Sequence, residues 1–193
     1  MYVVCYVAVV LRRLPDNQVQ PFGSSVYHMA LPDSDIDATI NLPSVAVDRH
    51  LSMQFFSKLA KHLQQSGFAS SVEVVSRTRV PVLKFKDTLF GFKFDVSLDN
   101  YHGIQQTAYM GKRTKQLPQL RPLFVALKAF LVQNNLASAR DGGINSLVLT
   151  SMVASFLEVC QAWDLPPVDA TLTLHFRQIP STKDLRRQRT SVI

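Results

Sequence analysis

Three aspartates at alternate positions, in DSDID at residues 33–37, are the feature that most constrains how this chain folds. Alternate side chains of a β-strand point to the same face, so Asp33, Asp35 and Asp37 would share one face of a strand. Like charges side by side on a strand repel each other. We therefore expect water, arginine side chains or a metal ion to compensate them.

A further carboxylate, Asp95, stands in the alternating segment FKFDVSL. If its strand neighbours that of Asp35 and Asp37, three carboxylates converge at one edge of a sheet. Such oxygen ligands suit two divalent ions that share bridging carboxylates. The preceding Gly23–Ser24 turn offers backbone N–H groups and a hydroxyl to a phosphate chain, since glycine lets the backbone approach closely.

Each part of this pattern also has an ordinary structural explanation. An aspartate in a DSD context commonly belongs to a turn or a helix cap, and Asp95 alone is compatible with a charge at a strand edge. The whole series is more specific than its parts: a Gly-Ser turn, an acid-x-acid pair on a strand, then one acid on a later strand.

The hydrophobic pattern predicts a strand-rich first half and a helical second half. Strands are expected at residues 19–23, 35–42, 71–76, 80–85 and 89–98, the last two joined into a hairpin by a turn at 86–88. Helical spacing covers residues 50–66, 104–113, 119–134 and 142–159. The apolar stretch at residues 1–14 predicts a buried helix or strand, not a membrane span. These patterns predict an α+β fold.

Composition limits the partners and the compartment. Lys and Arg outnumber Asp and Glu by 21 to 14, which favours an anionic partner such as nucleic acid, a nucleotide or a membrane surface. The two cysteines, Cys5 and Cys160, cannot form a disulfide framework, so we expect a reduced intracellular compartment. The histidines lack zinc-ligand spacing.

Ordered motifs give the chain a family resemblance. GSSVYHMALPDSDID at 23–37 followed by FKFDVSLDN at 92–100 resembles the signature of DNA polymerase β-like nucleotidyltransferases. RVPVLKF, LFVALKAFLVQNNL and GGINSLVLTSMVASFL are similar, in order and spacing, to noncanonical poly(A) RNA polymerases, above all the TRAMP-type catalytic subunit. The resemblance covers roughly residues 15–158. It implies a nucleotidyltransferase palm at 1–103, with a mixed, mostly antiparallel sheet and flanking helices. A partial helical central domain at 104–160 and an irregular basic tail at 161–193 would follow.

The resemblance also implies a reaction, the template-independent transfer of AMP from ATP to RNA 3′ ends. Asp35 and Asp37 would hold two Mg²⁺ (or Mn²⁺) ions. Asp95 would complete the second metal site and help to deprotonate the RNA 3′-hydroxyl. Gly23 and Ser24 would bind the β and γ phosphates. An RNA-binding partner protein, a nuclear location and no membrane attachment are further implications, with the cytoplasm as the alternative location.

Four more nucleotide-binding residues follow from the resemblance. Gly103 would lie near the ribose, Lys128 would reach the triphosphate, and Ser146 would bind phosphate at a helix N-terminus. Leu147 stands where the family usually has an aromatic ring that stacks on the base, and loss of such stacking forfeits about 1–3 kcal/mol. The structural alternatives are a solvated helix lysine for Lys128 and a simple helix cap for Ser146.

Two other functions stay open. Terminal uridylyl transfer uses the same motifs, and residues 160–193 do not resemble the base-reading motif of the family. The same absence, with Leu147, allows a truncated, non-catalytic remnant that binds RNA or a partner protein. The basic run near the C-terminus, from Lys183 to Arg189, is expected to be a solvated tail.

Overall fold

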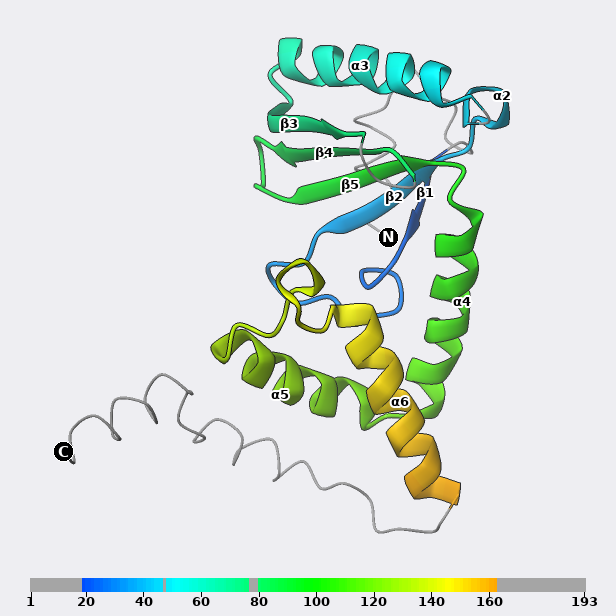
Figure 1. The fold of residues 1–193 in the computed structure, drawn as a ribbon, viewed down its shortest axis with the longest axis vertical. Coiled ribbons are helices and arrows are strands. Elements are labelled where there is room, and N and C mark those ends of the chain that lie inside the picture. The colour runs from blue at the N-terminus through cyan, green and yellow to red at the C-terminus, as the bar shows by residue number, and fades with distance from the viewer. Residues whose placement is uncertain (1–18, 47, 77–79, 163–193) are drawn as a thin grey trace, which may run out of the picture. The chain divides into compact units, whose positions relative to one another are not determined.

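The computed structural model describes residues 19–46, 48–76 and 80–162 (Figure 1). The expected element at residues 1–14 lies outside the described residues, as does the expected tail from residue 163 onward. The chain divides into two compact units, residues 1–112 and 113–193, each described by itself. The domain boundary expected at residue 103 stays a prediction. Among the described helices, none is both long and apolar enough to cross a membrane.

A five-stranded sheet forms the first unit. Its strands are β1 (Val19–Phe22), β2 (Ile36–Ile40), β3 (Ala69–Val75), β4 (Val82–Asp87) and β5 (Lys93–Leu98). They lie in the order β1-β2-β5-β4-β3, and only the β2–β5 pair is parallel. The mixed, mostly antiparallel sheet expected from the sequence is therefore confirmed.

The helices follow the predicted order. They are α2 (Pro43–Ala46), α3 (Arg49–Gln65), α4 (Tyr101–Gln116), α5 (Leu120–Gln133), the short 3-10 helix η2 (Ala139–Asp141) and α6 (Ser146–Ala162). α4 is longer at both ends than predicted. The helix expected from Gly142 begins instead at Ser146, because Gly142 has a φ of +80° and a Cβ on Gly143 would overlap the carbonyl oxygen of Leu136. The two glycines thus turn the chain before α6.

Helix α3 covers one face of the sheet (Figure 1). It begins at Asp48, whose side chain accepts the N–H groups of His50 and Leu51. Phe56 and Leu63 on its inner face are 0% and 1% exposed in the core of the sheet unit. Full burial of such side chains stabilises a fold by about 1.5–3 kcal/mol each. The packing of α3 therefore decides which face of the sheet is apolar.

The alternation of β2 sets the direction of its acidic residue. Ile36, Ala38 and Ile40 are buried in the core that α3 covers. Asp37 lies between the first two and points to the other face. Because a one-residue slip would exchange the two faces, the apolar core fixes the direction of Asp37.

The β4–β5 hairpin is confirmed, but its turn lies later than predicted. β4 continues through Asp87, which is 1% exposed, so the turn occupies residues 88–92. The Asp87 carboxylate accepts the backbone N–H groups of Leu89 at 3.0 Å, Phe90 at 2.7 Å and Phe92 at 2.5 Å. Charged acceptors of this kind hold a turn firmly, which explains why the strand extends to Asp87.

We expect Asp87→Ala to lower the free energy of unfolding by about 2–4 kcal/mol, since it leaves backbone N–H groups without their acceptor. Chemical denaturation would measure this change, with Asp33→Ala as the control because Asp33 is an exposed acid in another turn. Equal stability of the two variants would contradict the role given to Asp87.

Candidate active site

The pairing of β2 with β5 brings two carboxylates together. Asp37 and Asp95 are register partners in the parallel pair, and neighbouring strands lie about 4.8 Å apart. The charge of Asp35 acts on both and raises the pKa of each carboxyl. The structure therefore places Asp37 beside Asp95, with Asp35 close enough for its charge to act on both.

The expectation that Asp33 shares the strand face of Asp37 is wrong, and Asp35 lies just before the strand instead of on it. β2 begins at Ile36, and Asp33 lies exposed in a preceding turn. In that turn the Leu31 N–H donates to Ser34 Oγ at 2.9 Å, and the Ser34 N–H donates to the Leu31 carbonyl at 2.9 Å. Because this local bonding competes with the sheet ladder, Asp35 stands just before the strand.

The negative charge of the acidic cluster is only partly compensated by its surroundings. Burial is the main cause that raises the pKa of Asp37 to about 7, and the charges of Asp95 and then Asp35 add to it. Burial also raises the pKa of Asp95, against the hydrogen bond and charge of Lys84. The pKa of Tyr27 is raised by burial and then by Asp37. A cation would therefore bind here with favourable energy.

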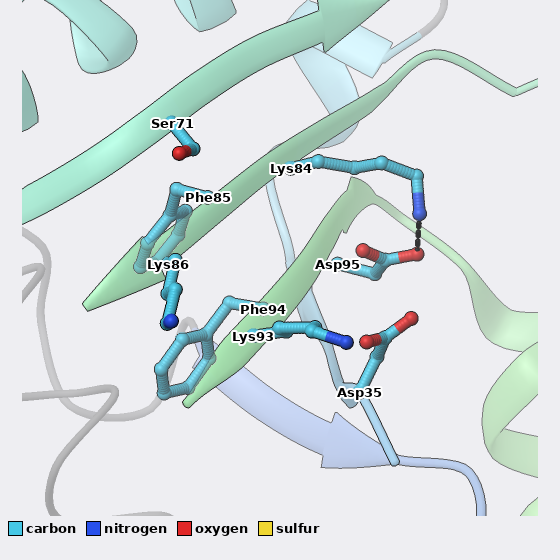
Figure 2. Close-up of a pocket in the computed structure, with 8 residues that line it drawn as sticks. All are labelled: Asp35, Ser71, Lys84, Phe85, Lys86, Lys93, Phe94 and Asp95. Atoms are coloured by element: carbon cyan, nitrogen blue, oxygen red, sulfur yellow. Dashed lines mark hydrogen bonds and ion pairs between the residues drawn. The ribbon is translucent and has the colours of Figure 1, made fainter. Parts of the chain in front are cut away.

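Lys84 compensates part of this negative charge, and the expected metal ion stays a prediction. Lys84 lies opposite Asp95 in the antiparallel pair of β4 with β5, and its Nζ donates to Asp95 Oδ2 (Figure 2). The side chains are 39% and 23% exposed, so the pair is partly screened by solvent. Sequence analysis gave Lys84 no role, although its alternation with the buried Leu83 and Phe85 places it on the acidic face.

The Gly23 turn packs directly against the acids. Gly23 has a φ of +77°, and a Cβ there would overlap Asp37 Oδ2. Its N–H donates to Thr107 Oγ1 at 2.7 Å, and the Thr107 hydroxyl donates to the Gly103 carbonyl at 2.7 Å. The Gly23 N–H is thus already engaged. The Ser24 hydroxyl makes no hydrogen bond to another described residue, and it stays the candidate contact for a phosphate.

Gly103 lies in the first turn of α4, close to β1. Its N–H donates to Asn100 Oδ1 at 2.9 Å, and a Cβ there would lie 2.8 Å from the Phe22 ring. This close packing, with the Thr107 bridge, positions the Gly23 turn. No sequence signal marked Thr107. The ribose contact expected of Gly103 stays a prediction.

An open pocket of about 290 Å³ lies on this side of the sheet (Figure 2). Its lining consists of Asp35, Ser71, Lys84, Phe85, Lys86, Lys93, Phe94 and Asp95. Lys93 extends toward Asp35 in the close-up. Carboxylates and ammonium groups thus line one cavity, which suits a ligand that carries both phosphates and a cation.

The other predicted residues belong to the second unit. Lys128 on α5 is partly buried, which lowers its pKa, and its Nζ donates to the Ala137 carbonyl at 3.2 Å. It is therefore not a fully solvated lysine. Asn145 caps α6 by accepting the Val148 N–H at 2.8 Å, so Ser146 is not the cap. Leu147 follows Ser146 and is half-buried. The roles predicted for Lys128, Ser146 and Leu147 stay predictions.

The donor set matches a hard divalent cation in chemistry. Asp35, Asp37 and Asp95 offer oxygen atoms only, which Mg²⁺ and Mn²⁺ prefer. In the described part of the chain, no three His, Cys, Asp or Glu side chains converge closely enough to form a ready metal site. Asp95 instead gives one oxygen to Lys84. A cation would compete with Lys84 for that oxygen.

This fold and site define the class of protein as a nucleotidyltransferase palm. The polymerase core of TRAMP, an RNA surveillance complex, has a solved structure that aligns with a TM-score of 0.73 and 27% identity over 90% of this chain and 55% of that chain. Residues 5–110 match the family described as the poly(A) RNA polymerase, mitochondrial-like, central palm domain. The chain belongs to this family of poly(A) RNA polymerases.

Two curated relatives show how far the likeness extends. The poly(A) RNA polymerase cid14 of Schizosaccharomyces pombe is 33% identical over 78% of this chain, which spans 22% of cid14. Trf4-2 of Drosophila melanogaster, a poly(A) RNA polymerase protein described as inactive, is 31% identical over 78% of this chain and 36% of its own length. The chain thus spans about a fifth to a third of these relatives.

We expect Gly23→Ala to displace the Asp37 carboxylate as well as strain the turn. Gly67→Ala is the matched control, because Gly67 has a φ of +67° and nothing within 4 Å of an added Cβ. Both variants should lose about 1 kcal/mol of stability for the backbone conformation, and Gly23→Ala about 1–3 kcal/mol more. Denaturation curves test this, and equal losses would contradict the contact with Asp37.

The raised pKa of Asp37 predicts how stability depends on pH. An acid that titrates at about 7 when folded and near 3.8 when unfolded keeps its proton longer in the folded state. Folding stability therefore falls as pH rises from about 4 to about 7. Asp37→Asn removes this loss. Without divalent ions, the variant should match the parent at pH 4 and exceed it at pH 8 by about 1–3 kcal/mol, a value discounted for solvent exposure.

Denaturation at both pH values checks this pH prediction. Parent and Asp37→Asn curves that coincide at pH 8 would show that the buried charge costs nothing.

Proposed function

We propose that this chain supplies the catalytic palm of an enzyme that adds AMP from ATP to RNA 3′ ends without a template. The observation that carries the proposal is the parallel register of Asp37 and Asp95, with Asp35 beside them, in a chain of the poly(A) RNA polymerase family. Burial and repulsion prepare this acidic centre for cations and for the proton of an attacking hydroxyl.

The reaction forms one bond and breaks another. The 3′-oxygen of RNA attacks the α-phosphorus of ATP, and the bond to the bridging oxygen of the β-phosphate breaks, so pyrophosphate leaves. Asp95 takes the proton of the 3′-hydroxyl, since its carboxylate is partly buried on the acidic face. Lys84 holds the Asp95 side chain in place.

The remaining residues bind and orient the substrates. Asp35 and Asp37 would hold Mg²⁺ together with Asp95, and the bound ions would stabilise the charge that develops on the triphosphate. The Ser24 hydroxyl donates to the phosphates from the turn that Gly23 keeps close to Asp37. For Lys128 and Ser146 we keep the triphosphate contacts that the family resemblance implies.

A non-catalytic palm that binds RNA or a partner protein is the second candidate. Trf4-2, which is described as inactive, is 31% identical to this chain, so a non-catalytic role is compatible with this degree of similarity. Leu147, at the position expected to stack on the base, favours weak nucleotide binding.

Primer extension separates the candidates. Purified full chain is incubated with a labelled oligoadenylate, Mg²⁺ or Mn²⁺, and each ribonucleotide in turn. Extension with ATP supports adenylyl transfer, and extension with UTP alone would replace it by uridylyl transfer. If the folded chain extends the primer with none of the four ribonucleotides, the non-catalytic palm is the supported candidate.

We expect Asp35→Ala to lower ATP incorporation by at least about 1,000-fold, because charge stabilisation at such centres supplies several kcal/mol of the rate. Asp33→Ala is the matched control, an exposed acid only two positions earlier. Incorporation rates measure both. Similar incorporation rates for the two variants would show that Asp35 is not part of the catalytic centre.

Leu147 gives a test of base contact. A tyrosine there should stack on the base and lower the KM for ATP by roughly fivefold or more. Val148→Tyr is the control, since Val148 is 47% exposed and points in a different direction around α6. Steady-state kinetics measure both variants. An equal effect of both would mean that the gain comes from added surface and not from the position of Leu147.

A further inference from the structure

The tip of the β4–β5 hairpin, residues 88–92, presents large apolar side chains to solvent. Leu89 is 71% exposed, Phe90 62% and Phe92 47%. The Phe90 and Phe92 ring centroids lie 5.9 Å apart with an interplanar angle of 36°. Because adjacent exposed aromatic rings are unusual at a turn, this hairpin tip has the character of a contact surface.

Hydrogen bonds within the turn hold the hairpin tip in one conformation. Asp87 accepts the N–H groups of the turn, including those of Phe90 and Phe92. Gly91 has a φ of +74°, and a Cβ there would lie 3.3 Å from Lys86 Cε, so the stem of Lys86 packs over the turn. A surface that is already ordered loses little entropy on binding.

Two lysines give the hairpin tip a preference for anions. Lys86 and Lys93 are register partners across the hairpin, and both are exposed. Like charges directly opposite each other repel, and since Lys93 extends toward Asp35, a further anion would sit beside Lys86. Both residues also line the pocket that contains Asp35 and Asp95 (Figure 2). The pattern of rings between cations matches the combination that binds single-stranded nucleic acid.

The position of the hairpin tip suits the chain that leads to a reacting 3′ end. Lys93 lies two residues before Asp95 on β5 and therefore on the same face, about 7 Å away along the extended backbone, and Phe92 belongs to the turn just before this strand. RNA whose 3′-hydroxyl reaches Asp95 can thus run past Lys93 toward the hairpin tip.

We propose that the hairpin tip is a binding site for single-stranded RNA upstream of the 3′ end. Phe90 and Phe92 stack on bases, and Lys86 and Lys93 contact phosphates. The inference rests on the function proposed above for its choice of RNA. Stacking on any base gives affinity without sequence preference, which suits the addition of nucleotides to many RNAs.

Binding is tested on the full chain without nucleoside triphosphate. Fluorescence anisotropy measures the Kd of a labelled single-stranded RNA of about 12 nucleotides, within the site sizes of known single-strand binders. The double variant Phe90→Ala/Phe92→Ala should weaken binding at least about tenfold. Leu89→Ala is the matched control, because Leu89 is the most exposed apolar side chain of the tip but cannot stack.

Salt dependence separates the two contributions. Lys86→Gln and Lys93→Gln should each reduce the slope of log K against log salt by about 0.7, whereas the phenylalanine variants leave the slope unchanged. If Leu89→Ala weakens binding as much as the double variant, the tip is a general apolar surface of the kind that docks proteins, and the proposal fails. It also fails if the parent and the double variant bind the RNA equally.

The assay keeps this inference apart from the proposed function. If the chain extends no primer but the phenylalanine variants lose RNA binding, the binding site is supported and the proposed catalytic function is contradicted. If the chain extends primers but the double variant binds RNA normally, the proposed function is supported and this binding site is contradicted.

Discussion

The parallel pairing of β2 with β5 is the constraint on which the site depends. It places Asp37 beside Asp95 at a distance where two buried charges repel strongly. The apolar residues Ile36, Ala38 and Ile40 hold the register, because a one-residue slip would bury the carboxylate and expose the core. At neutral pH the buried, mutually repelling carboxylates therefore lower the free energy of unfolding, and the apolar core must offset this loss.

Neighbouring features follow from that repulsion. Lys84 compensates part of it from β4, and Gly23 leaves room for the Asp37 carboxylate that any side chain would take. Thr107 joins the Gly23 turn to α4. Such a centre is held together by its surroundings and not by its own charges, as is usual for sites where binding of a cation completes the electrostatics.

The sequence predicted the sheet, the order of the helices and the meeting of Asp35, Asp37 and Asp95, because alternation and apolar spacing reflect the core directly. It did not predict Lys84 or Thr107, whose partners depend on strand pairing and on the approach of a helix. The hairpin turn was misplaced because Asp87 resembles a turn residue, while its carboxylate in fact bonds the turn from the end of β4.

Asp37 and Asp95 form one acidic centre that we expect to bind a divalent cation. Carbon-13 NMR of the aspartate carboxyls during a pH titration, without and with Mg²⁺, tests it most directly. Without Mg²⁺, we expect Asp37 to titrate with a pKa of about 7. With Mg²⁺, that pKa should fall by at least about two units, and the Asp37 and Asp95 signals should shift together. An Asp37 pKa that Mg²⁺ leaves unchanged would contradict the account.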